Sequence, residues 1–283
     1  MKLSLQRIAV PAALGGVLLA AYWNSLEGSF HYDDFHSILH NPHIRDLGNL
    51  PAFFLDPTRF SVDVDKAMYR PLLLVSYALN YAWGRYDETG YHLVSLLLHY
   101  GCVHLVWRIA GIAGCGPRAA VFAALLFALH PLASEPVNYI SSRSELLGSL
   151  LFLAAFRWFL LDTARHRAVG VALFAMGLLS KEMVITLPLL LWLYQSWMAG
   201  AAAPRLRQHL AMWLVAAVYL AGLLLSGALS RSMAVIEASR LSQVSVASVA
   251  GIVGEQLWTQ IKAAVFYLEL LCPGSRRSGW SGR

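Results

Sequence analysis

Residues 91–110 read YHLVSLLLHYGCVHLVWRIA, and this stretch decides the fold class. It is as long as a helix that crosses a bilayer, and most of its side chains are apolar or aromatic. Further apolar runs lie at about residues 5–23, 119–132, 145–161, 168–180, 184–199, 209–229 and 250–271. The sequence therefore predicts an all-α polytopic membrane protein with about seven or eight transmembrane helices. The two runs that flank Ser180-Lys181-Glu182 also fit one helical hairpin that dips into the membrane.

The composition supports a membrane protein. Apolar residues make up 58% of the 283 residues and charged residues 13%, whereas a soluble domain carries about 25% charged residues. The net charge of +6 comes from basic residues that recur in every second loop and not from one basic patch. With the N-terminus placed inside, the inner segments hold Lys2, Arg7, Arg108, Arg118, Arg165, Arg167, Arg205, Arg207, Arg276 and Arg277. This positive-inside pattern predicts a cytoplasmic N-terminus, in a bacterial inner membrane or the ER membrane, and no nucleic-acid partner.

The first outer loop is the largest polar segment, at about residues 24–90. It belongs to one membrane domain, which we place at residues 1–272 and which an atypical tail follows at residues 273–283. Within the loop, the apolar stretch from Leu72 to Trp83 is too short to span and predicts a helix that lies in the interface or re-enters the membrane. Most carboxylates also fall on the outer side, which indicates that this face carries the chemistry.

Asp33 and Asp34 are the candidate catalytic residues, in the stretch FHYDDFHSILHN at residues 30–41. Adjacent carboxylates suit a general base, because either one can accept a proton. They also suit a divalent-cation site, and they fit an ordinary solvated turn. The residues alone leave these three interpretations open.

Two basic residues stand at the predicted outer ends of apolar runs. Arg70 fits either an anchor that reaches the interface or a ligand for a lipid phosphate, and with the preceding Tyr69 it is a candidate substrate-binding residue. Lys181 either pairs with Glu182 or provides a point charge for a phosphate.

Residues 130–145, HPLASEPVNYISSRSE, carry more polar side chains than the anchoring of a helix requires. If Tyr139 to Glu145 begins a span, Arg143 lies at or just below the outer interface, with Tyr139 one turn away on the same helical face. Ionisable groups at such places are often functional, so His130, Glu135, Tyr139 and Arg143 are candidate substrate-binding residues.

A histidine metal site is the weaker interpretation. His36 and His40 are four residues apart and would chelate a metal on a helix. However, Asn41-Pro42 ends any helix there, and no paired cysteines accompany the histidines. We therefore predict no metal site from these residues.

Four segments resemble a known family. They are FHYDDFHSILHN (30–41), MYRPLLLVSYALNYAWGRYDETGYHLVSLLLHY (68–100), ALLFALHPLASEPVNYISSRSELLGSLLFLAAF (124–156) and GLLSKEMVITLPLLLWLYQSW (177–197). The chain resembles the transmembrane O-mannosyltransferases with tetratricopeptide repeats and their bacterial relatives, which have the GT-C fold. The resemblance covers about residues 1–270 in order.

The resemblance implies a GT-C-type bundle with a large first outer loop. Such an enzyme moves a sugar, here expected to be mannose, from a polyprenyl-phosphate donor to a hydroxyl of a protein or glycan acceptor. Transfer takes place on the outer face and inverts the anomeric carbon. Asp33 and Asp34 stand where the family has the acidic motif that supplies the base, and we expect Asp33 to be that base. Arg70, Arg143 and Lys181 stand where basic residues hold the lipid-linked phosphate.

The resemblance implies no firm cofactor, and a divalent cation at Asp33 and Asp34 stays an alternative. The family continues into further spans and helical repeats, whereas this sequence ends in CPGSRRSGWSGR. That ending predicts a truncated or frame-shifted product. A non-catalytic transporter or assembly factor is the rival interpretation, but a transporter would place its ionisable groups near the midplane.

Overall fold

The computed structural model describes residues 2–63, 66–198 and 206–225, and in these ranges the chain is helical with no β-strand. All described residues belong to one compact unit, Met1–Arg231. The predicted span at 250–271 and the tail at 273–283 therefore lie outside the described residues, as does Arg205.

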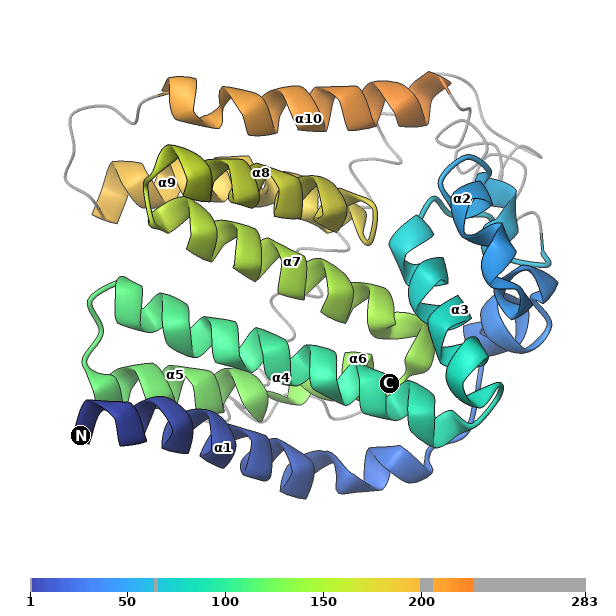
Figure 1. Ribbon diagram of the computed structural model, residues 1–283, viewed down its shortest axis with the longest axis horizontal. Coiled ribbons are helices and arrows are strands. Elements are labelled where there is room, and N and C mark those ends of the chain that lie inside the picture. The colour runs from blue at the N-terminus through green and yellow to red at the C-terminus, as the bar shows by residue number, and fades with distance from the viewer. Residues whose placement is uncertain (1, 64–65, 199–205, 226–283) are drawn as a thin grey trace, which may run out of the picture. The chain divides into compact units, whose positions relative to one another are not determined.

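Among the described residues, seven helices make up the bundle, and they run side by side with alternating directions (Figure 1). They are α1 (Lys2–Tyr22), α4 (Glu88–Ile112), α5 (Pro117–Ala128), α7 (Arg143–Leu160), α8 (Ala164–Leu178), α9 (Leu187–Met198) and α10 (Leu206–Leu225). Each one corresponds to an apolar run of the sequence. The segments Ile8–Glu27 and Glu88–Ile112 are each long and apolar enough to cross a membrane. A count of seven or eight spans stays a prediction.

A third candidate span is bent. Helix α5 is followed by the segment Pro131–Asn138, and the two directions differ by 53°. Pro131 has no backbone N–H and its ring would clash with the preceding turn, so α5 cannot continue through it. The chain then forms two short turns, η7 (Pro131–Ala133) and α6 (Ser134–Asn138), before η8 (Ile140–Ser142) leads into α7.

The segment predicted as the first outer loop, called the outer loop below, is folded against the end of the bundle (Figure 1). It contains η1 (Trp23–Glu27), η2 (Phe35–Leu39), η3 (Pro42–Arg45), η4 (Leu47–Asn49), α2 (Leu50–Phe53), η5 (Pro57–Phe60) and α3 (Pro71–Gly84). The buried amide of Asn41 holds it together by donating to the carbonyl oxygens of Ser37, Arg59 and Phe60. The predicted stretch Leu72–Trp83 lies within α3, which begins at Pro71, a residue well suited to the first turn of a helix.

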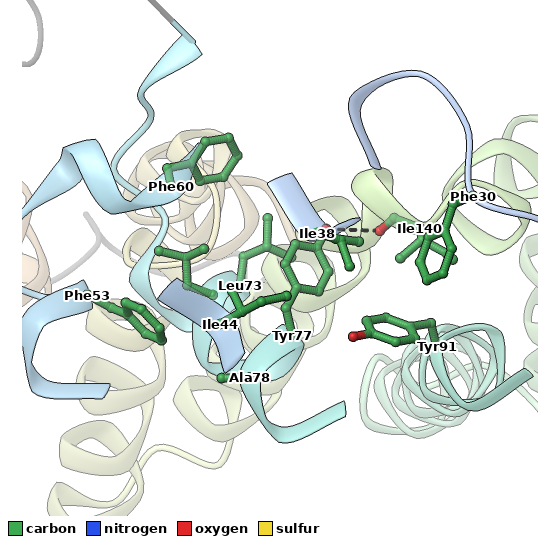
Figure 2. Packing of buried hydrophobic residues seen from close by; sticks show 11 residues of the cluster. Phe30, Ile38, Ile44, Phe53, Phe60, Leu73, Tyr77, Ala78, Tyr91 and Ile140 are labelled. Atoms are coloured by element: carbon green, nitrogen blue, oxygen red, sulfur yellow. Dashed lines mark hydrogen bonds between the residues drawn. The ribbon is translucent and has the colours of Figure 1, made fainter. Parts of the chain in front are cut away.

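Three buried clusters form the core. The first joins the outer loop to α3 and α4 and includes Phe30, Ile38, Ile44, Phe53, Phe60, Leu73, Tyr77, Tyr91 and Ile140 (Figure 2). The Tyr77 hydroxyl in this cluster donates to the Ile140 carbonyl oxygen at 3.1 Å. The second cluster joins α7, α8, α9 and α10, and the third joins α1, α4, α5 and α6. The first cluster matters most for function, because it fixes the loop that carries Asp33 and Asp34.

Candidate functional site

Asp34 is buried and its carboxylate is fully engaged. One oxygen accepts from the His31 backbone N–H at 3.1 Å, and the other accepts from the Ser141 hydroxyl. Burial raises the pKa of Asp34, and the hydrogen bonds from Ser141 and His31 oppose that rise without cancelling it. The hydrogen bond from Ser141 to Asp34 therefore links η8 to the outer loop.

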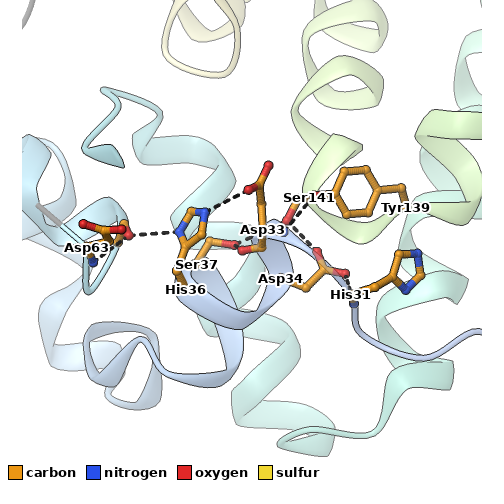
Figure 3. A network of polar contacts seen from close by, with 9 residues as sticks. His31, Asp33, Asp34, His36, Ser37, Asp63, Tyr139 and Ser141 are labelled. Atoms are coloured by element: carbon orange, nitrogen blue, oxygen red, sulfur yellow. Dashed lines mark hydrogen bonds and ion pairs between the residues drawn. The ribbon is translucent and has the colours of Figure 1, made fainter. Parts of the chain in front are cut away.

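Asp33 has the opposite environment. Its side chain is 59% exposed, and its Oδ1 lies 3.1 Å from Nε2 of His36. Its backbone N–H donates to the Tyr139 hydroxyl at 2.9 Å. Figure 3 shows the two neighbouring carboxylates turned toward different partners. Of the two, only Asp33 is placed to accept a proton from a bound molecule.

A cavity of about 220 Å³ opens beside Asp33. It is lined by Asp33, His36, Ser37, Phe60, Lys66, Met68, Arg70, Tyr77 and Ser141. The cavity thus combines an exposed carboxylate with two side chains that carry positive charge, Lys66 and Arg70. A pocket of this kind can hold an anionic group and accept a proton beside it.

Arg70 lies in this cavity but has a protein partner as well. Its NH2 is 2.9 Å from Oε1 of Glu182, and its NH1 donates to Ser144 Oγ at 3.4 Å. Its buried Nε has no hydrogen-bond partner among the described residues. Burial raises the pKa of Glu182, but the hydrogen bond and charge of Arg70 outweigh burial, so the net effect is to lower it.

Lys181 is not among the residues that line the cavity. Its Nζ lies 2.7 Å from Oε1 of Glu145. The alternative that Lys181 and Glu182 pair with each other is wrong, because each has a partner on a different element.

Arg143 is not among the residues that line the 220 Å³ cavity either. Its side chain is completely buried, and its guanidinium lies over the rings of Tyr77 and Tyr91 at 5.1 and 5.3 Å. It donates to Asn80 Oδ1 at 2.7 Å and to the Tyr91 carbonyl oxygen at 2.8 Å. Arg143 therefore links α3, α4 and α7 inside the protein.

Tyr139 does not share a helical face with Arg143. Its backbone is extended, with φ −107° and ψ 114°, and α7 begins only at Arg143. The reason is that the chain turns between α6 and η8, which places the Tyr139 hydroxyl against Asp33 instead. The ring of His31 stacks on the Tyr139 ring at 5.5 Å.

His130 and Glu135 lie outside the 220 Å³ cavity. His130 accepts from the Leu132 backbone N–H at 3.2 Å and thereby caps η7, and Glu135 is exposed on α6. Sequence reasoning missed Lys66 as a site residue, since a single lysine among acidic neighbours gives no spacing signal. It considered His36 only as a metal ligand, although its spacing of three residues from Asp33 is a pairing signal on a helix.

A second cavity, of about 400 Å³, is apolar and is lined in part by Tyr69, the residue that precedes Arg70 in the sequence. Its lining includes Tyr69, Phe54, Leu178, Val215 and Tyr219, from the outer loop, α8 and α10. Tyr69 donates its hydroxyl to the Phe54 carbonyl oxygen at 3.0 Å. Tyr69 therefore lines the apolar cavity, and the next residue, Arg70, lines the charged cavity beside Asp33.

The carboxylates of Asp33 and Asp34 are turned toward different partners, and a divalent cation between them stays an alternative (Figure 3). A divalent cation takes several oxygen ligands, and both carboxylate oxygens of Asp34 already accept hydrogen bonds. Across the described ranges, no three His, Cys, Asp or Glu side chains are grouped so as to hold a metal ion.

Comparisons with known proteins agree with the resemblance of the four sequence segments. The human Protein O-mannosyl-transferase TMTC3 is 31% identical over 194 residues, which cover 65% of this chain and 21% of that protein. The Drosophila melanogaster Protein O-mannosyl-transferase Tmtc1 is 31% identical over 199 residues, 66% of this chain and 23% of that protein. The chain spans about a fifth of the length of the curated relatives that it matches. No protein-family model and no solved structure matches it.

Proposed function

We propose that this chain, a homologue of the protein O-mannosyl-transferases, carries the donor and base sites of a membrane glycosyltransferase. The reaction moves a mannosyl group from a polyprenyl-phosphate donor to a hydroxyl of a protein acceptor. It takes place on the outer or lumenal face, in a GT-C-type bundle with a cytoplasmic N-terminus. The relatives are named as protein O-mannosyl-transferases, which supports mannosyl transfer to protein.

One observation carries the proposal: Asp33 and Arg70 line the same 220 Å³ cavity, together with Lys66. Glycosyl transfer from a phosphate needs a group that accepts the acceptor's proton and groups that stabilise the departing phosphate. These two requirements call for opposite charges close to one another, and the cavity offers both.

Asp33 acts as the general base. As the acceptor oxygen bonds to the anomeric carbon, its proton passes to the Asp33 carboxylate, and the electron pair of the breaking C–O bond leaves with the phosphate. Direct displacement inverts the anomeric carbon. The protonated carboxyl group then releases its proton to water, because the Asp33 side chain is 59% exposed.

Arg70 and Lys66 stabilise the phosphate as negative charge develops on it. The guanidinium fork of Arg70 suits two phosphate oxygens, and Lys66 adds a point charge. In the structure Arg70 binds Glu182, so the donor phosphate has to share or replace that partner. Electrostatic stabilisation of this kind is usually the largest single contribution to catalysis.

The apolar cavity beside Tyr69 takes the first isoprenoid units of the donor. Its lining is mostly aliphatic and aromatic, and burying each methylene group contributes roughly 0.8 kcal/mol. Because Tyr69 directly precedes Arg70, a lipid tail in this cavity places its phosphate near the charged cavity.

The test compares Asp33→Asn with Asp46→Asn in chain reconstituted in nanodiscs. Radiolabelled polyprenyl-phosphate-mannose is the donor, and a serine- and threonine-containing peptide is the acceptor. Asp33→Asn should lower the turnover number by about 10²–10⁴-fold, the contribution of a general base, and leave donor binding unchanged. Asp46, which caps the turn at Gly48 with its side chain, is the matched control and should keep full activity. A wild-type chain that binds no donor, or an Asp33→Asn variant with full turnover, would contradict the proposal.

A further inference from the structure

Three side chains form a hydrogen-bonded row that ends at the proposed base. Ser61 Oγ lies 2.9 Å from Nδ1 of His36, and Nε2 of His36 lies 3.1 Å from Oδ1 of Asp33. Ser61 Oγ also accepts from the Asp63 backbone N–H at 2.9 Å. Figure 3 shows this row crossing from the Asp63 turn to Asp33.

Hydrogen-bond chemistry assigns the proton positions in the row. An ionised carboxylate can only accept, so His36 donates through Nε2–H to Asp33. In a neutral imidazole Nδ1 then accepts, and the Ser61 hydroxyl is its donor. The lone pairs of Ser61 Oγ remain free for the Asp63 N–H. A neutral His36 therefore satisfies every group in the row.

The surroundings hold His36 in this orientation. Its side chain is only 14% exposed, and its carbonyl oxygen accepts from the Val62 backbone N–H at 3.3 Å. Residues 61–62 thus contact both the ring and the backbone of His36. The residue lies in η2 (Phe35–Leu39), a π-helical turn, and such turns often occur at functional sites.

We propose that His36 is a positioning residue for Asp33, fixed by Ser61. The imidazole donates to Oδ1 of Asp33 and holds the carboxylate in place, which leaves Oδ2 to take the proton of the acceptor hydroxyl. No proton passes to His36 during the reaction: the acceptor O–H bond breaks, Oδ2 gains the proton, and the departing phosphate takes the electron pair. This inference rests on the proposed function.

The kinetic test uses His36→Leu, His36→Gln and Ser61→Ala in the full chain. Leucine fills the space without a donor, and glutamine can place an N–H near the position of Nε2. His36→Leu should lower the turnover number by about 10–100-fold, because a charge-assisted hydrogen bond to the base is lost. His36→Gln should recover most of that loss. The turnover number of Ser61→Ala should lie between those of His36→Leu and the wild type. The KM for polyprenyl-phosphate-mannose should stay within about twofold in each. His40→Gln is the matched control, since His40 lies next to the same turn and contacts Phe35 instead of Asp33.

Equal losses in His36→Leu and His36→Gln would overturn the inference, and so would a raised KM with an unchanged turnover number. A wild-type chain without transfer activity would instead contradict the proposed function. In that case ¹⁵N-histidine NMR still tests whether His36 donates to Asp33 and accepts from Ser61. The wild-type signal that is absent from the spectrum of His36→Leu belongs to His36. Its chemical shifts should show the Nε2–H tautomer, and they should change in Asp33→Ala and in Ser61→Ala. An Nδ1–H tautomer would show that His36 does not donate to Asp33.

Discussion

At the scale of the residue, two identical neighbours have different environments. Asp33 is exposed and contacts His36, whereas Asp34 is buried and bonds to His31 and Ser141. From the sequence we predicted the acidic pair and preferred Asp33, but no local signal separates the two. The separation comes from Ser141, which is more than a hundred residues away in the chain. Long-range contacts of this kind cannot be predicted from spacing.

The burial of Asp34 predicts how stability depends on pH. Its pKa is higher in the folded protein than the usual 3.9 of an unfolded chain, so the folded state binds the proton more tightly. The stability associated with this proton is present below the unfolded pKa and is lost as the pH rises through the folded pKa. Wild-type chain should therefore lose unfolding free energy relative to Asp34→Asn as the pH rises from below about 3.9 through the raised pKa of Asp34. Denaturant titration in detergent measures it, with Asp46→Asn as the control, and parallel curves for wild type and Asp34→Asn would disprove the prediction.

We expect Arg143 to contribute to the stability of the folded protein. Its removal leaves the Asn80 amide oxygen and the Tyr91 carbonyl oxygen without their donor in a buried place. Arg143→Met should lower the unfolding free energy by about 2–4 kcal/mol, the cost of two unsatisfied buried acceptors. Arg167→Met is the control, because Arg167 forms an exposed ion pair with Asp162 and such pairs contribute about 0–1 kcal/mol. If the two variants are equally stable and only Arg143→Met binds the donor more weakly, Arg143 contributes to binding of the donor phosphate and not to stability.

At the scale of the element, the long helices could be predicted and the short ones could not. The apolar runs at 91–110 and 145–161 became α4 and α7 within a few residues, since the hydrophobic pattern alone indicates such helices. The turns between Pro131 and Ser142 were missed as separate elements. Short helices gain their stability from tertiary packing and caps and not from propensity, so η7, α6 and η8 leave no periodic pattern to read.

Gly177 shows how closely these elements pack. A Cβ built at Gly177 in α8 would lie 2.7 Å from Cγ1 of Val184 in η9 (Glu182–Thr186). Gly177→Ala should therefore destabilise the chain by about 1–3 kcal/mol, the usual cost of overpacking. It should also lower transfer activity, because η9 carries Glu182, the partner of Arg70. Gly111→Ala in α4 meets nothing within 4 Å and should be neutral or slightly stabilising. Thermal unfolding of both variants checks this, and equal melting temperatures would refute it.

At the scale of the whole molecule, the alternating helix directions have a consequence for topology. In the unit Met1–Arg231, the outer loop with α2 and α3 lies at one end of the bundle, and the α4–α5 and α7–α8 connections lie at the other end with the N-terminus (Figure 1). The second group of segments carries the basic residues Arg118, Arg165 and Arg167. A positive charge excess near short loops marks the cytoplasmic side. The cavity beside Asp33 is then expected on the outer side.

Cysteine labelling in sealed, oriented vesicles tests this arrangement in a background in which the native cysteines are replaced by serine. Cysteines at Asn24 and at Asp46 should react with a membrane-impermeant maleimide added outside. A cysteine at Arg165 should react only after the vesicles are permeabilised, because α7 brings the chain back to the inner side before α8 begins. Cys102 is buried and Cys115 is exposed, so restoring Cys115 alone gives a second inner position near the α4–α5 connection and should behave like Arg165. Labelling at Arg165 from the outside would place the basic loops with the Asp33 cavity. That result would contradict both the cytoplasmic N-terminus and an outer-face transfer reaction.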